Sequence, residues 1–97
     1  MNLARIKEME SYLNECTAAT KELAEQLDRT DALREHMIRL FDYYGSSEWY
    51  EDREAEAPKD VPAGVLSEDL VYDQIIELRD MAYHMLELAT DILKNRI

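Results

Sequence analysis

The chain has 97 residues, of which 46% are hydrophobic, and its net charge at pH 7 is -11. A chain this rich in apolar residues can bury a core, so it is not a disordered acidic tail. Free nucleic acid and anionic lipid are excluded as direct partners, because a strongly negative field repels both.

The negative charge is concentrated in the middle of the chain. Residues 42–80 carry twelve acidic and three basic side chains, whereas residues 1–41 carry eight acidic and six basic ones. Such a region is compatible with a basic protein surface, a cationic ligand or a metal ion. A solvated surface that only keeps the protein soluble is the competing interpretation.

The composition favours helices. Two glycines and two prolines supply few turns, so we expect one all-α domain over residues 1–97. The sequence shows no leader and no apolar run long enough to cross a bilayer, so we expect a cytoplasmic protein without membrane contact. The single Cys16 lies on an apolar stripe, which predicts a buried thiol in a reducing compartment.

Two apolar stripes with different phases occupy the first half of the chain. The first predicts a helix over residues 2–28 and consists of Ile6, Met9, Leu13, Cys16, Thr20, Leu23 and Leu27. The second predicts a helix over residues 31–44 and consists of Leu33, Met37, Leu40, Phe41 and Tyr44. Thr30 or Asp31 is the expected N-cap of the second helix, and one continuous kinked helix is the alternative.

The segment after Gly45 has no helical period. Gly45 is a suitable C-cap for the second helix, and residues 46–66 then predict an acidic connecting loop, which we call the acidic strap. Its aromatic residues Trp49 and Tyr50 are expected to anchor it against the helices.

Ser67 is the expected N-cap of a last helix over residues 68–95, which carries an apolar stripe as long as the first. The predicted fold is therefore a small antiparallel helical bundle of two long helices and a shorter one, with the acidic strap between the second and third helices. Uncovered parts of the long stripes favour a homodimer.

The residues around the acidic strap resemble a family of short bacterial proteins, common in Firmicutes, that is classed as a domain of unknown function. The resemblance covers nearly the whole chain and rests on Tyr43-Tyr44-Gly45-Ser46, Glu48-Trp49, Asp52, Gly64-Val65-Leu66-Ser67-Glu68-Asp69 and Tyr72-Asp73. The run from Gly64 to Asp69 is its most specific part. Because that family has no established activity, the resemblance implies no catalytic residue.

The sequence favours a non-enzymatic protein-interaction module that binds a basic partner surface. Carboxylates pair with guanidinium groups and aromatic rings stack on them. The candidate contact residues are Tyr44, Glu48, Trp49, Tyr50, Asp52, Glu54, Glu68, Asp69 and Asp73. A purely structural role for these residues is the competing hypothesis, and an acidic inhibitor of phage or mobile-element type that mimics nucleic acid is a third.

For the favoured interaction module we expect no cofactor and no metal site. The enzymatic alternative is a magnesium-dependent hydrolase on a helical bundle. Pairs of carboxylates one helical turn apart can share a hard cation, and such pairs are Glu22 with Glu25 and Glu77 with Asp80. Two further metal candidates are weak: His84 with Asp80 and Glu87, and a calcium loop of Asp52, Glu54 and Glu56, which lacks the necessary glycine.

Overall fold

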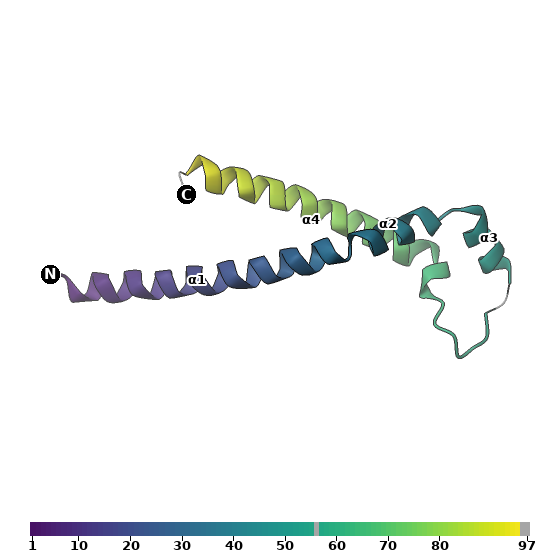
Figure 1. Cartoon of the computed structure of the whole chain (residues 1–97), viewed down its shortest axis with the longest axis horizontal. Coiled ribbons are helices and arrows are strands. Elements are labelled where there is room, and N and C mark those ends of the chain that lie inside the picture. Colours follow the sequence, from purple (N-terminus) through teal and green to yellow (C-terminus); the bar gives the residue numbers. More distant parts are fainter. Residues whose placement is uncertain (56, 96–97) are drawn as a thin grey trace. The chain divides into compact units, whose positions relative to one another are not determined.

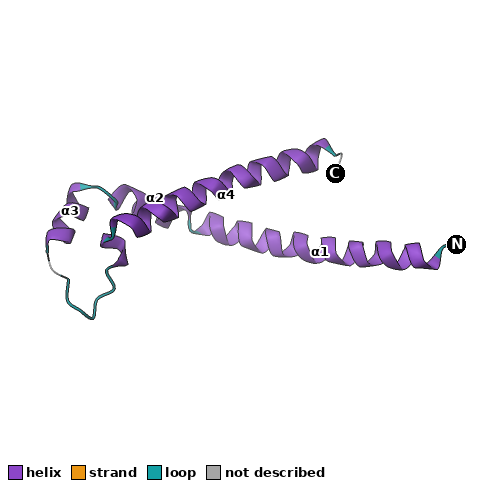
Figure 2. Ribbon diagram, turned by 180° about the vertical axis from the view of Figure 1, so that it is seen from behind, coloured by secondary structure: helices purple, strands orange, loops and turns teal. Residues whose placement is uncertain are grey.

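The chain folds into helices joined by short connections. The computed structural model describes residues 1–55 and 57–95, and within them it contains helices and loops but no strand (Figures 1 and 2). The elements in chain order are α1 (Leu3–Ala32), α2 (Arg34–Tyr43), α3 (Ser47–Glu54), the short 3-10 helix η1 (Gly64–Leu66) and α4 (Glu68–Lys94). The predicted all-α class is confirmed.

The described residues belong to two units, which divide between residues 37 and 38. The first unit consists of α1 and the beginning of α2, and the second contains the rest of α2 with α3, η1 and α4. We describe each unit by itself. The antiparallel packing of the two long helices therefore stays a prediction.

Helix α1 starts at a side-chain cap, where the Asn2 Oδ1 accepts the backbone N–H of Arg5 at 3.0 Å. All of its residues are exposed, including the predicted apolar stripe. The prediction that Cys16 is a buried thiol is wrong, because this residue is exposed. Within its own unit, a single long helix has no second surface that could cover the stripe.

The boundary between α1 and α2 lies at Leu33, later than the sequence predicted. Thr30 and Asp31 are inside α1 and cap nothing, so that prediction is wrong. Without glycine or proline the helix continues to Ala32, and the Leu33 N–H then reaches the carbonyls of Arg29 at 3.3 Å and Thr30 at 3.1 Å. This tighter turn changes the phase of the apolar residues without a large change of backbone conformation, since Leu33 keeps φ -89° and ψ -1°.

The turn after α2 ends at Gly45. This residue has φ +78°, the left-handed conformation that glycine adopts at little cost. The predicted stop at Gly45 is confirmed. The acidic strap, however, is not a loop throughout, because Ser46 caps α3 and its Oγ accepts the Trp49 N–H at 3.2 Å. An eight-residue helix needs only one inward apolar residue, so it leaves no periodic pattern in the sequence.

The core of the second unit is small and lies around Trp49. In the described residues only Trp49, 2% exposed, and Val71, 4% exposed, are buried apolar side chains. Helices α3 and α4 both pack against η1. The approach of η1 to α4 is close, since a Cβ added to Gly64 would lie 3.2 Å from the Leu70 Cδ1.

Helix α4 begins as predicted at the Ser67 cap, whose Oγ accepts the N–H groups of Asp69 at 3.3 Å and Leu70 at 3.5 Å. Its first turns contribute the buried Val71 and the half-buried Ile75, Ile76 and Leu78, whereas residues 79–95 are exposed. None of the helices in the described part of the chain combines the length and apolarity that crossing a bilayer requires.

Replacing Trp49 by alanine is expected to lower the free energy of unfolding by about 3–5 kcal/mol, because the largest side chain of a small core is removed. Urea unfolding followed by far-UV circular dichroism measures the loss. Tyr50→Ala is the matched control on the same helix, because the Tyr50 side chain is 55% exposed and its removal should cost about 1 kcal/mol or less. Equal losses in the two variants would contradict a core built on Trp49.

Candidate functional site

The candidate site is the surface around Trp49, where α3, η1 and the start of α4 meet. The indole Nε1–H donates to the carbonyl oxygen of Val65 at 2.9 Å. The rings of Tyr44 and Tyr50 each meet the Trp49 ring edge-on, with centroids 5.0 Å apart. Trp49 thereby joins the connection after α2, α3 and η1 in one cluster.

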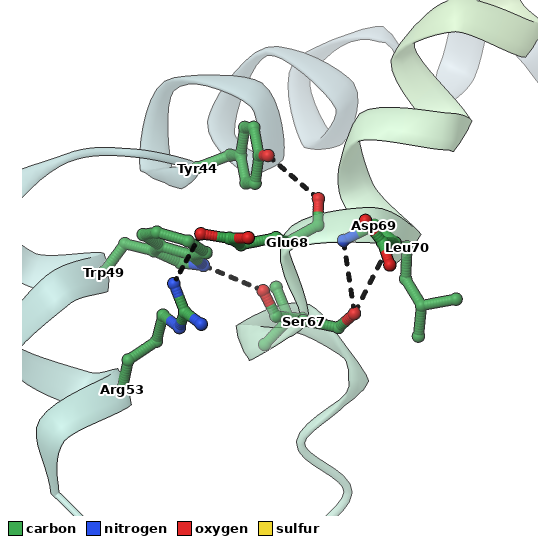
Figure 3. A network of polar contacts seen from close by, with 8 residues as sticks. Tyr44, Trp49, Arg53, Ser67, Glu68, Asp69 and Leu70 are labelled. Atoms are coloured by element: carbon green, nitrogen blue, oxygen red, sulfur yellow. Dashed lines mark hydrogen bonds and ion pairs between the residues drawn. The ribbon is translucent and has the colours of Figure 1, made fainter.

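Arg53 covers one side of the Trp49 ring. Its guanidinium carbon lies 4.6 Å from the ring centroid, and its Nη1 is 3.3 Å from the Glu68 Oε1 (Figure 3). The guanidinium therefore has a π face and a carboxylate as neighbours at once, a favourable position for a cation. Because both side chains of the ion pair are partly exposed, its net contribution to stability is modest.

Tyr44 completes the attachment of α4 to this cluster. Its hydroxyl donates to the backbone carbonyl of Glu68 at 2.9 Å, while its ring packs against Trp49. Figure 3 shows both contacts of Glu68: Tyr44 binds the backbone carbonyl of Glu68, and Arg53 binds the carboxylate of Glu68. Tyr44 and Glu68, both predicted contact residues, thus have structural partners within the chain.

Tyr43 and Asp52 form a second polar pair on the same unit. The Tyr43 hydroxyl donates to the Asp52 Oδ2 at 2.6 Å. This hydrogen bond, together with partial desolvation and the negative charges of Asp52 and Glu48, raises the pKa of Tyr43 to about 12. The phenol therefore stays a proton donor at neutral pH and holds the Asp52 carboxylate in place.

The structure separates the predicted contact residues into exposed and buried ones. Tyr50 and all the predicted carboxylates are exposed; the carboxylates are Glu48, Asp52, Glu54, Glu68, Asp69 and Asp73. Tyr44 is half-buried and Trp49 is buried. The prediction that Trp49 is a contact residue does not fit its position, because a partner cannot reach a ring that the chain itself covers.

The exposed carboxylates lie on outward faces of two helices. On α3, helical geometry turns Glu51 and Glu54 away from the inward Trp49 and places Glu48 at the flank. On α4, Asp69 and Asp73 are four residues apart, so they share one face, which points away from the buried Val71. These two acidic faces belong to the same unit and are joined through η1.

The sequence interpretation missed the contacts of Arg53 and Tyr43. Arg53 follows Trp49 by four residues, which would have placed it over the ring if residues 47–54 had been recognised as a helix. Ser46 as an N-cap, with Glu48 in the first turn, was the available signal for that helix. The partner of Tyr43 depends on how the chain turns at Gly45, which no local pattern reveals.

The metal candidates receive no support from the arrangement of the side chains. Within residues 1–55 and 57–95, no three His, Cys, Asp or Glu side chains are grouped so that they could hold a metal ion. The set of His84 with Asp80 and Glu87 is therefore not such a group, and neither Glu22 with Glu25 nor Glu77 with Asp80 has a third ligand beside it. The calcium loop falls partly on Glu56, which lies outside the described residues.

Comparison with known protein families agrees with the resemblance seen in the sequence. A family model described as "Domain of unknown function (DUF4298)" matches residues 6–88, which include every element except the end of α4 and the first turn of α1. No curated protein matches the chain.

The Tyr43–Asp52 pair predicts an unusual alkaline titration. Because the pKa of Tyr43 in the folded chain, about 12, exceeds the ordinary value of 10.0, the pair stabilises the fold fully below pH 10, and this contribution is lost as the pH rises through about 12. Phenolate absorbance should show a late step that Tyr43→Phe removes. Asp52→Asn should move that step toward pH 10, and an unchanged step would contradict the pairing.

Proposed function

This chain belongs to the DUF4298 family, and we propose that it is a non-enzymatic protein-interaction module that binds a basic partner surface through the outward side of α3. The observation that carries this proposal is the contrast between Trp49, 2% exposed, and its exposed acidic neighbours Glu48, Glu51 and Glu54. The buried indole holds the helix in place. Carboxylates on a fixed helix lose less conformational entropy on binding than carboxylates on a mobile loop.

Charge complementarity supports a basic partner. The ion pairs in the described residues are Arg34 with Asp31 and Arg53 with Glu68, so Glu48, Glu51 and Glu54 on α3 have no cationic partner in that part of the chain. An approaching surface rich in arginine would neutralise them and would be attracted from a distance. The exposed Tyr50 ring beside them offers a surface on which a guanidinium can stack.

The first turns of α4 extend the proposed contact surface. Asp69 and Asp73 are exposed on one face of the helix, and Asp52 is exposed beside Tyr43. In this proposal a second group of residues holds the surface in place without contacting the partner. The group consists of Tyr44, Trp49, Arg53 and the backbone of Glu68. The proposal thus keeps the predicted acidic residues other than Glu68, adds Glu51, and assigns Tyr44 and Trp49 to the support of the surface.

Two alternatives remain for this acidic surface. A chain that mimics nucleic acid would bind the nucleic-acid site of its partner, and DNA would then compete with it for that partner. A magnesium-dependent hydrolase would need several carboxylates around one ion, an arrangement that the described residues do not contain. We propose an interaction without catalysis. We also propose that the protein acts in the cytoplasm, where an exposed Cys16 would stay reduced.

We also propose that the chain self-associates through α1. The apolar stripe of this helix is exposed along its length, with Leu13 near its centre 58% exposed. A long helix with one uncovered apolar stripe is stable in water only when another surface covers that stripe. The first 41 residues carry little net charge, so two copies can approach there without the repulsion that residues 42–80 would cause.

The α3 surface is tested by the triple variant Glu48→Gln, Glu51→Gln and Glu54→Gln. The protein and the variant are immobilised, exposed to lysate at low and at moderate salt, and the captured proteins are identified. We expect the wild type to capture a basic partner. The triple variant should capture about tenfold less of this partner, or even less, because several charge-assisted contacts disappear together. Moderate salt should weaken the wild-type complex in the same direction.

The matched control is Glu15→Gln, Glu22→Gln and Glu25→Gln, which removes the same charge from exposed positions on α1. Capture that falls equally with both triple variants would reject the α3 surface, since it would depend on net charge alone. Displacement of the chain from its partner by DNA would favour the mimic. Far-UV circular dichroism confirms that each variant keeps its helices.

Self-association is tested with Leu13→Asp by sedimentation equilibrium. We expect the wild type to dimerise and the variant to dissociate about tenfold or more readily, because a charge replaces an apolar side chain in the covered stripe. Asn14→Asp is the control, since it adds the same charge on the polar face of the same helix. A wild type that stays monomeric at high protein concentration would reject this part of the proposal.

A further inference from the structure

An open hollow of about 370 Å³ lies between the end of α3 and the segment that leads into η1. Its wall is formed mainly by small and branched apolar side chains, among them Ala55, Pro58, Val61 and Leu66. Tyr43 and Asp52 contribute its polar part. All of these residues belong to the unit that starts at residue 38.

The carboxylate in this hollow is held in position but not neutralised. Tyr43 donates to the Asp52 Oδ2 at 2.6 Å, which leaves the Oδ1 and further lone pairs as acceptors. The neighbouring cation, Arg53, points instead to Trp49 and Glu68. In the described part of the chain Asp52 has no ion pair, and it is exposed to solvent.

A ligand that fits both parts of the hollow has an apolar body and a cationic end. An anion would be repelled by Asp52, and a purely apolar group would leave the carboxylate without a partner. An arginine side chain has an aliphatic stem that packs on apolar surface and a planar guanidinium that binds a carboxylate with two parallel hydrogen bonds. A lysine shares the stem, but its ammonium lacks the planar pair of donors.

We propose that this hollow receives an arginine side chain of the protein partner, with the stem along the apolar wall and the guanidinium on Asp52. The inference rests on the proposed function, and it specifies which side chain the basic partner presents. Tyr43 acts as a positioning residue, because its hydroxyl fixes the carboxylate that meets the guanidinium. The apolar wall discriminates in favour of a long side chain over a small cation.

The experiment uses the full chain labelled with ¹⁵N and titrated with N-acetyl-arginine N-methylamide. We expect the backbone amide signals of Ala55, Val61 and Ala63 to shift in a saturable way. The citrulline analogue, which has nearly the same shape without the charge, should bind about tenfold more weakly, as expected for the loss of a charge-assisted bidentate contact. The lysine analogue should bind with intermediate strength.

Two variants make the test specific. Asp52→Asn keeps an acceptor for the Tyr43 hydroxyl but removes the charge, so arginine binding should weaken to the level of citrulline. Glu77→Gln is the control, because it removes one exposed carboxylate from α4 in the same unit, away from the hollow. Equal binding of arginine and citrulline, shifts confined to other residues, or binding that survives Asp52→Asn would overturn the inference.

The outcomes separate this inference from the proposed function. If partner capture depends on Glu48, Glu51 and Glu54 but is unchanged by Asp52→Asn, the interaction surface stands and the arginine site is rejected. If arginine binds at the hollow but no partner depends on the α3 glutamates, the arginine site stands and the wider surface is rejected.

Discussion

The buried indole of Trp49 is the contact on which the second unit depends. Its ring fills the small core, and its N–H reaches the Val65 carbonyl at 2.9 Å. This hydrogen bond joins α3 directly to η1, although Val65 follows Trp49 by sixteen residues in the chain. A large aromatic side chain with one polar atom suits this position, since it supplies apolar area and satisfies a backbone acceptor at once.

The charges of the second unit are arranged around this contact. Arg53 is close to both the Trp49 ring and the Glu68 carboxylate, so one cation relieves part of the repulsion that the acidic segment creates. Asp52 is stabilised differently, by the Tyr43 hydroxyl. The glutamates of α3, Glu48, Glu51 and Glu54, have neither kind of support in the described residues. This difference is why we propose them, and not the groups that hold the fold together, as the binding surface.

The first unit presents the opposite problem, because it has a long apolar stripe and no core of its own. Every residue of α1 is exposed, and a helix gains most of its stability from packing of its apolar face. We propose that association with another helical surface supplies what this unit lacks. In our proposal the long helix serves assembly and the acidic surface serves recognition.

The sequence by itself determined the elements whose signals are local. The spacing of apolar residues located the long helices, Ser67 marked the start of α4, and Gly45 marked the turn after α2, because periodicity, capping and a positive φ each depend on a few neighbouring residues. The candidate acidic residues followed from the concentration of negative charge in residues 42–80. The apolar spacing did not reveal α3, because this helix has a single inward apolar residue, Trp49, and one residue cannot form a periodic pattern. Only the tertiary structure decided that Trp49 is buried while Tyr50 beside it stays exposed, and that Tyr43 holds Asp52. The first depends on how η1 returns to meet the indole, and the second on how the chain turns at Gly45. The position of Arg53 over Trp49 is instead a local consequence of α3, a helix that the sequence pattern did not reveal.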